Sequence, residues 1–472
     1  MNCSTTRWRS LAAAFLAALL TGGTVQARSD AWLKLEQIDV QPNGAPTATR
    51  YAIKNPTISD DGRWVIFDSP ASDLVSGDSN GRSDIFVRDR LVNITRRIDL
   101  RPDGTQTTAD STSAAASSDG RFVTFISFDR QLAANDVNDY DDQFVLDRDS
   151  DGNGTFDEPG GTTLDLVSIN SGNITFYNGV RKVVSAVNDG GTSVLYSTIY
   201  PVASGDNNSK ADVYVRERTS ASTRLLSQSS SGVIGNDDSP DFFRPPLRMS
   251  DSGAIVAFSS SASNLVAGDT NAADDLFVRD RDIDGNGIFD EAGGSTTVLA
   301  GTGPGGSGAP FLQFDLSGDG RWLAITAANT SSANPAGSDI YLHDLTSGND
   351  SPIAFVAQTW KKGTGVCCGN QSPKLSRKAQ VLVFTSHQGY TLDNVITGRN
   401  DVFAQSRGRA LVRLTDYPLP SSLEDGYSAV VGTLSRNGGY LLIGFAGAGA
   451  VASPEEGFFI YQRDEIFASD FE

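Results

Sequence analysis

The stretch Ser-Asp-Asp-Gly-Arg-Trp-Val-Ile-Phe, residues 59–67, joins a tight-turn signal to an alternating apolar run. The phrase recurs six more times along the 472 residues, with small variations at the turn. Its seven copies are spaced at intervals of 58, 71, 62, 67, 59 and 59 residues. A period of this length, built from short strands and Asp-Gly turns, predicts a propeller or a solenoid. The seven copies centre on Gly62, Gly120, Gly191, Gly253, Gly320, Ala379 and Gly438.

Each repeat contains the elements of one four-stranded sheet. In the first unit, residues 64–68, 84–90 and 95–100 are rich in Val, Ile, Phe and Thr and alternate with period two. A further short strand ahead of the turn brings the unit to four strands, which matches one propeller blade. Solenoid periods are usually shorter, so the pattern favours a propeller.

The two ends of the chain complement each other. The last unit stops after its third strand, at residues 457–463, whereas residues 34–44 match the fourth-strand segment 94–104 of the first unit. An N-terminal strand that completes the last blade would leave no open sheet edge. We therefore predict an all-β fold, a seven-bladed β-propeller of four-stranded blades closed by an N-terminal strand.

The repeat also resembles a known family. Ser-x-Asp-Gly-Arg-x-Val-x-Phe, followed about 20 residues later by Asp-Ile-Phe-Val-Arg-Asp, is similar to the TolB-type (WD-like) β-propeller repeat. The resemblance covers nearly the whole chain after the leader and is weakest in unit six, where Arg377-Lys378-Ala379 replaces the Asp-Gly turn. TolB proteins carry an α/β domain before their propeller. Only about 30 residues separate the leader from the first repeat here, so the role of TolB in envelope assembly is not carried over.

The N-terminus has the layout of a secretory signal. Arg7 and Arg9 precede an apolar run at 11–20, and Val-Gln-Ala follows at 25–27. This layout predicts a signal peptide at 1–27, a propeller at 28–463 and a C-terminal tail at 464–472. No later segment is long and apolar enough to cross a membrane. We expect an exported protein, periplasmic or extracellular, with no transmembrane segment in the mature chain.

The composition of the chain argues against several classes of function. Without residues 1–27 the chain has 36 basic and 57 acidic residues, a formal charge of −21, which argues against a nucleic-acid partner. There are two histidines and no Gly-x-Ser-x-Gly, His-Glu-x-x-His or phosphate-loop motif. The adjacent Cys367 and Cys368 could form a strained ring or remain a free pair.

Two acidic loops, residues 147–158 and 280–291, are near-identical copies. They place carboxylates at every second position around glycines, and calcium binds six to eight such oxygens. The loops resemble the calcium loops of EF-hands and dockerin-like repeats. In the first loop, the series of calcium-ligand positions can start at Asp149 or at Asp147. The alternative is a solvated acidic turn. The predicted calcium ligands are Asp147, Asp149, Asp151, Asn153, Asp157 and Glu158 in the first loop, and Asp280, Asp282, Asp284, Asn286, Asp290 and Glu291 in the second.

A shorter acidic pattern, Gly-Asp-x-Asn, lies between the second and third strands at residues 77–80, 205–208 and 268–271, with a looser copy at 135–139. An aspartate follows each copy. The pattern is typical of Asx turns, in which a short side chain bonds the backbone two residues on. A cation-binding or carbohydrate-facing rim is the alternative.

Two functional classes follow from these observations. The first is an exported, calcium-binding propeller that acts as a non-enzymatic binding or scaffold module for an envelope or extracellular protein or glycan, with the face of the short acidic loops as the expected contact. The second is a hydrolase or lyase that uses carboxylates of the propeller channel. An enzyme needs convergent carboxylates at the channel mouth and a raised pKa in at least one of them. No catalytic residue stands out, so the sequence favours binding.

Overall fold

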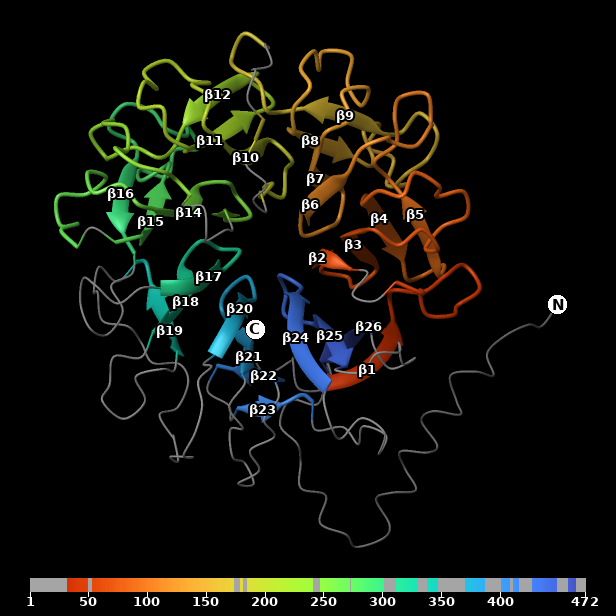
Figure 1. Cartoon of the computed structure of the whole chain (residues 1–472). Coiled ribbons are helices and arrows are strands. Elements are labelled where there is room, and N and C mark those ends of the chain that lie inside the picture. Colours follow the sequence, from red (N-terminus) through yellow and green to blue (C-terminus); the bar gives the residue numbers. More distant parts are fainter. Residues whose placement is uncertain are drawn as a thin grey trace, which may run out of the picture.

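The computed structural model shows seven antiparallel sheets arranged as blades around a central axis (Figure 1). No helix occurs in the part of the chain that the model describes. The signal peptide, the cysteine pair and the C-terminal tail predicted from the sequence lie outside that part. The described residues are 32–49, 53–173, 179–180, 185–240, 247–271, 273–300, 311–328, 338–346, 370–386, 400–407, 411–415, 427–447 and 457–463.

The strands follow one another around the ring in chain order. Blades 1 and 2 contain β2 (Lys54–Ile58), β3 (Trp64–Ser69), β4 (Asp84–Asp89), β5 (Ile94–Arg97), β6 (Ser111–Ala116), β7 (Phe122–Ser127), β8 (Asp142–Asp147) and β9 (Thr163–Leu166). Blades 3 and 4 contain β10 (Ser193–Thr198), β11 (Asp212–Glu217), β12 (Ser222–Leu225), β13 (Arg248–Met249), β14 (Ile255–Ser260), β15 (Asp275–Asp280) and β16 (Thr296–Leu299). Blades 5 to 7 contain β17 (Phe311–Leu316), β18 (Trp322–Ala328), β19 (Ser338–Asp344), β20 (Asn370–Leu375), β21 (Val381–Ser386), β22 (Asp401–Ser406), β23 (Val412–Arg413), β24 (Tyr427–Leu434), β25 (Tyr440–Gly447) and β26 (Gly457–Arg463).

Five blades show four strands in the described residues, and the third and fifth show three. In the third blade, bridges from Val180 to Thr198 and from Val187 to Val194 continue the sheet beyond β10 on its inner side. The predicted all-β, seven-bladed propeller is therefore confirmed.

The N-terminal strand β1 (Trp32–Gln37) completes the seventh blade. It pairs antiparallel with β26, Lys34 opposite Tyr461 and Gln37 opposite Phe459, and the sheet order is β1-β26-β25-β24. The first and last described strands thus share one sheet, and closure by the N-terminal strand is confirmed. The ring has no open edge at this junction.

The repeated phrase forms the same hydrogen-bonded turn in every blade. In blade 1 the Gly62 N–H donates to the Ser59 carbonyl, and the Trp64 N–H donates to Ser59 Oγ at 2.9 Å. Glycine suits the turn because its φ is +68°. In unit six Ala379 adopts a φ of +50° and keeps the turn. The side-chain acceptors are Ser59, Ser117, Asn188, Ser250, Ser317, Ser376 and Ser435.

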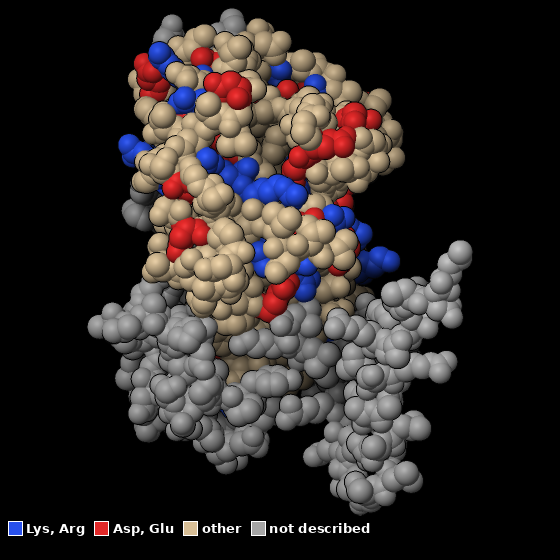
Figure 2. All heavy atoms as spheres, turned by 90° about the vertical axis from the view of Figure 1, so that its right-hand side faces the viewer, with Lys and Arg blue, Asp and Glu red and all other residues tan. Residues whose placement is uncertain are grey.

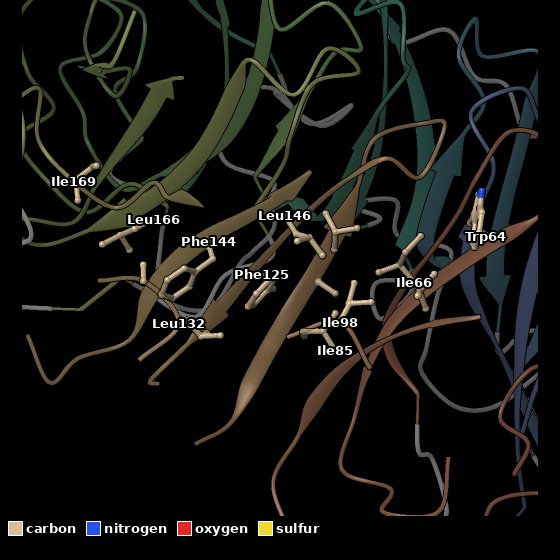
Figure 3. Close-up of a cluster of buried hydrophobic side chains, with 14 residues drawn as sticks. Trp64, Ile66, Ile85, Ile98, Phe125, Leu132, Phe144, Leu146, Leu166 and Ile169 are labelled. Carbon is tan, nitrogen blue, oxygen red and sulfur yellow. The ribbon is translucent and has the colours of Figure 1, made fainter. Parts of the chain in front are cut away.

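The hydrophobic core lies within and between neighbouring blades. Figure 3 shows Ile66 and Ile85 of blade 1 facing Phe125 and Leu146 of blade 2. Five blades also stack an aromatic ring of their second strand on one of their third, such as Phe125 on Phe144 with centroids 5.8 Å apart. Burial of these side chains joins each blade to the next.

The seven side chains named above are called the turn acceptors. At the axis, residues just after each turn acceptor link one blade to the next through hydrogen bonds. Asp60 N–H donates to the Ser118 carbonyl (2.7 Å), and Ser118 N–H donates to Asp189 Oδ1 (2.9 Å). Similar bonds continue from blade to blade, and the last, from Asn437 N–H to Asp60 Oδ1 (2.7 Å), closes the circle. These hydrogen bonds connect all seven blades around one end of the axis.

Arg377 joins this circle through its side chain. It departs from the repeat phrase in unit six, and its guanidinium contacts residues of four other blades. Nε lies 2.5 Å from Asp251, and Nη2 lies 3.2 Å from Asp60 and 3.3 Å from Asp189. Nη2 also donates to Ser118 Oγ at 3.1 Å. Arg377 therefore brings one positive charge to a cluster of three carboxylates at the axis, and Arg436 adds a second beside Asp251.

Deletion of residues 28–48 tests the closure. The deletion removes the β1–β26 ladder and uncovers the outer edge of blade 7, so the free energy of unfolding should fall by several kcal/mol. Urea unfolding of the truncated and intact mature proteins measures the difference. Removal of residues 464–472, which follow β26, is the control and should have little effect. Equal unfolding midpoints for the two truncations would contradict the closure.

Replacement of Arg377 tests the axial ion cluster. Arg377→Met leaves Asp60, Asp189 and Asp251 without their shared cation and should cost about 1–2 kcal/mol, because the site is partly exposed. Burial raises the pKa of Asp60, so the loss should be larger at pH 8 than at pH 5, where more of that carboxyl is protonated and the repulsion is weaker. Thermal melts across this range measure it. Lys378→Met, at the exposed neighbouring position, is the matched control, and an equal, pH-independent loss in both variants would argue against the cluster.

Candidate functional site

The inner strands of the blades enclose a cavity of about 440 Å³ on the axis. Its walls come from β2, β6, β13, β17, β20 and β24, together with residues 185–187 of blade 3. Ser118 and Arg436 of the axial circle also line it, so the circle lies at one end. The cavity is thus built by seven segments that are far apart in the sequence.

Basic side chains outnumber acidic ones in the described lining of this cavity. Lys54, Arg248, Lys374 and Arg436 line it, and Asp315 is the one carboxylate among the described lining residues. The basic lining contrasts with the formal charge of −19 of the whole chain. It also contrasts with the outer side of the ring in Figure 2, where acidic and basic side chains are interspersed.

Three of these charged residues occupy one position of the repeat. Arg248, Asp315 and Lys374 each lie two residues before the turn acceptor of their blade, in β13, β17 and β20. Strand alternation gives equivalent residues equivalent orientations, so adjacent blades present them to the same level of the cavity. Arg248 Nε contacts Asp315 Oδ1 at 2.6 Å, and the Leu375 N–H donates to Asp315 Oδ2 at 2.9 Å.

The cavity environment changes the acidity of two of these groups. Burial, and then the charge of Arg248, lower the pKa of Lys374 to about 8, although Asp315 opposes the change. Burial alone would raise the pKa of Asp315, but Lys374, Arg248 and Arg436 outweigh it and lower the pKa. Asp315 therefore stays ionised, and the cations around it exceed what it can neutralise.

Arg436 is held in place by the floor of the cavity. Its Nη1 donates to the Leu316 carbonyl at 3.0 Å, and its Nε lies 3.3 Å from Asp251 Oδ1. Arg248 and Arg436 are therefore anchored, whereas Lys54 is exposed. Anchored guanidinium groups are suited to bind carboxylate or phosphate oxygens.

The inner strands carry β-bulges beside the cavity. The strand register shifts between Lys54 and Thr57 in blade 1, and equivalent shifts occur in blades 2, 5, 6 and 7. Asn55, Ser113 and Ser372 adopt left-handed φ angles of 46°, 61° and 52° at these bulges. Bulges of this kind often re-aim side chains beside binding sites.

The first predicted calcium loop pairs two of its acids with arginines. Arg121 binds Asp147 (2.8 and 2.9 Å), and Arg148 binds Asp157 (2.8 and 2.6 Å). The sequence interpretation missed these partners, although an arginine stands between the first two aspartates of each loop. Asn153 holds the other predicted ligands of this loop together. Its side-chain amide donates to Asp151 and Glu158, and its backbone N–H donates to Asp149.

The second loop repeats this arrangement in part, with Ala254 in place of Arg121. Asp290 binds Arg281 (2.9 Å) and Arg279 (3.2 Å), and the Asp282 N–H donates to Asp280. The Asn286 amide bridges Asp284 (2.9 Å) and Glu291 (2.6 Å), and the Asn286 N–H donates to Asp282. No three His, Cys, Asp or Glu side chains within the described ranges are grouped so that they could hold a metal ion. Calcium binding by the two loops stays a prediction.

The short Gly-Asp-x-Asn loops form the expected Asx turns. Asn80, Asn208 and Asn271 accept hydrogen bonds from backbone N–H groups two residues later, at 2.8–2.9 Å. Their amides donate to the first aspartate of the following strand. The asparagines of this face are therefore engaged in holding the loops.

Among the described residues, the structure contains no helix with the length and apolar character needed to span a membrane.

Calcium titration tests the two long loops. Asp151→Ser with Asp284→Ser removes one exposed oxygen ligand from each loop, so the rise in melting temperature that calcium gives should shrink by mass action. Isothermal titration and thermal melts in millimolar calcium measure the effect. Asp103→Ser, at an exposed turn elsewhere, is the control. A calcium response that is the same in all three proteins would rule out the loop sites.

Comparison with known proteins gives similarity in structure alone. No family model and no curated protein match the chain. The similar solved structures include TolB from Acinetobacter baumannii, 13% identical over 86% of this chain and 65% of that chain, with a TM-score of 0.38. They also include the β-propeller domain of the Trilobed protease from Pyrococcus furiosus (12% identity, 78% of this chain and 86% of that chain, TM-score 0.44). A puromycin hydrolase is 12% identical over 85% of this chain and 51% of that chain (TM-score 0.47).

The chain thus spans just under two thirds of that TolB and about half of the hydrolase. Similarity at this level concerns the fold alone. The strand topology itself establishes that this chain forms a seven-bladed β-propeller.

Proposed function

We propose that this protein is an exported, non-enzymatic binding module whose axial cavity takes a carboxylate-bearing segment of an envelope or extracellular protein or glycan. The observation that carries the proposal is the excess of cations in the described cavity lining, four against one carboxylate, in an otherwise acidic protein. Asp315 holds the Arg248 guanidinium and Asp251 holds that of Arg436, and the positive charge that remains in this concave site favours a ligand of opposite charge.

The lining supports binding over the hydrolase or lyase alternative. An acid–base pair needs two carboxylates, or one with a raised pKa, close to the substrate. Asp315 is bound to Arg248, and its neighbours lower its pKa, so it is a poor proton donor near neutral pH. The same neighbours suit a ligand carboxylate, which can accept charge-assisted hydrogen bonds from Arg248 and Lys374.

Export and calcium complete the proposal. The leader supports export, which would expose the mature chain to the calcium of the outer environment. Calcium in the two long loops would then stabilise blades 2 and 4, which carry them. The loops follow β8 and β15, so calcium there would act on the scaffold and not on the ligand.

Replacement of Lys374 tests the proposed cavity. Lys374→Gln keeps a polar side chain but removes one ligand-facing charge, so affinity for an acidic ligand should fall about tenfold, which corresponds to ~1.4 kcal/mol. Binding of acidic peptides and of oligouronates is measured by titration calorimetry. Lys210→Gln, a surface lysine paired with Asp237, is the matched control and should bind as the unmodified protein does.

The pH dependence gives a second readout. Lys374 has a pKa of about 8, so it loses its charge as pH rises from 7 to 9, and affinity should fall over that range in the unmodified protein but not in Lys374→Gln. Absence of binding by both ligand classes at millimolar concentration would refute the proposal. Turnover of either ligand that Asp315→Asn abolishes would favour the hydrolase or lyase.

A further inference from the structure

Blades 1 to 4 each bury a pair of aspartates that the cavity does not use. One member comes from the short Gly-Asp-x-Asn loop or its looser copy, and the other is the first residue of the third strand. The pairs lie between the second and third strands of each blade, at the opposite end of the third strand from the long acidic loops. In blade 2, that strand separates the two by about 17 Å. The four pairs are Asp78 with Asp84, Asp136 with Asp142, Asp206 with Asp212, and Asp269 with Asp275.

In blade 1 an arginine neutralises the pair. Arg97 lies on the outermost strand β5, opposite Phe86, and its Nη1 is 3.3 Å from Asp78 and 3.6 Å from Asp84. Blade 6 repeats the arrangement, where Arg413 lies opposite Phe403 and 3.8 Å from Asp401. The repeat position of Arg97 is thus a place for a cation beside the strand aspartate.

Blades 2 and 4 have leucine at this position. Leu166 lies opposite Phe144, and Leu299 lies opposite Phe277. Blade 3 also has leucine there, Leu225 opposite Tyr214, but its aspartates have other hydrogen-bond donors. Leucine supplies no charge and no hydrogen-bond donor. The aspartates of blades 2 and 4 therefore lack the countercharge that the arginine supplies in blades 1 and 6.

The carboxylate oxygens of these two blades show the consequence. Asp136 and Asp142 are 6% and 0% exposed, and Asp269 and Asp275 are 8% and 5% exposed. Each of the four has a buried oxygen with no hydrogen-bond partner among the described residues. Asp84 Oδ2 of blade 1 also accepts no hydrogen bond there, but the charge of Arg97 lies 3.6 Å from it. Buried oxygens of this kind are costly unless something binds them.

In blade 3 the Tyr214 hydroxyl donates to Asp206, which Phe144 and Phe277 cannot do at the same position. Ser227 donates to Asp212 as Ser168 does to Asp142 in blade 2.

The electrostatics agree with a missing cation. Burial, together with the neighbouring carboxylate, raises the pKa of Asp142 to about 7 and that of Asp275 to about 6. Two adjacent buried carboxylates cannot both ionise without a countercharge. The site therefore takes up either a proton or a cation.

We propose that blades 2 and 4 each bind a calcium ion between the loop aspartate and the strand aspartate, at the place where the Arg97 guanidinium lies in blade 1. Hard divalent cations prefer carboxylate oxygens, and calcium accepts irregular coordination completed by carbonyl oxygens and water. Such an ion would tie the loop before β8 and β15 to the strand itself. These two sites are separate from the long loops at 147–158 and 280–291.

Counting bound calcium tests the proposal. Native mass spectrometry of the mature protein in calcium should show one ion fewer in Asp136→Asn, one fewer in Asp269→Asn and two fewer in the double variant. Asp78→Asn is the matched control, because Arg97 already occupies that site, and its count should not change. The double variant of the long loops, Asp151→Ser with Asp284→Ser, should retain the two ions, so the two classes of site are distinguishable.

Exchange of the arginine and leucine provides the reverse test. Leu166→Arg and Leu299→Arg copy blade 1, so each should lose one ion, whereas Arg97→Leu copies blades 2 and 4 and should gain one. Circular dichroism establishes that each variant folds. Unchanged counts in the folded Asp136→Asn and Asp269→Asn variants would overturn the proposal and leave a shared proton as the countercharge.

Discussion

The fold depends on one hydrogen bond that occurs in all seven blades. A serine or asparagine side chain accepts from the backbone N–H five residues later, as Ser59 does from Trp64, while the turn between them takes a left-handed residue such as Gly62. This bond closes the turn between the two strands nearest the axis, such as β2 and β3 in blade 1. It also brings the next residue, such as Asp60 or Ser118, into the circle of hydrogen bonds that links the blades. The hydrogen bonds of one short turn therefore contribute both to the first hairpin of each blade and to the closure of the ring.

Charge is distributed unevenly between the outside and the axis. The chain has a formal charge of −19, yet the described cavity lining has four cations and one carboxylate. An isolated buried charge is costly, and here anchoring reduces that cost: Arg248 is bound to Asp315, and Arg436 to backbone carbonyls and Asp251. Cations held in this way need little rearrangement when an anionic ligand arrives, which favours binding.

Equivalent positions in different blades carry different side chains on the same strand arrangement. The position of Arg97 is arginine in blades 1 and 6 and leucine in blades 2, 3 and 4. In blade 3 a tyrosine hydroxyl binds the loop aspartate instead. The position two residues before the turn is threonine in blade 1 but Arg248, Asp315 and Lys374 in blades 4, 5 and 6. A repeat fold allows such changes because each blade contacts only its neighbours and the axis. The candidate functional residues of this molecule are therefore side chains at single positions of a blade structure that all seven repeats share.

The sequence alone determined the architecture. The seven-fold period, the alternating strands and the match between residues 34–44 and 94–104 predicted the propeller and its closure, because turn chemistry and strand alternation act over a few residues. The Asx turns of Asn80 and Asn208 were predictable for the same reason.

Only the tertiary structure revealed the cavity. Arg248, Asp315 and Lys374 are 67 and 59 residues apart and meet because ring closure stacks equivalent positions of adjacent blades. The pairing of Asp147 with Arg121 was likewise hidden, since it depends on strand register and not on the loop that contains the aspartate. Side chains from separate blades share a site only after the whole ring has closed, and no local pattern in the sequence encodes that proximity.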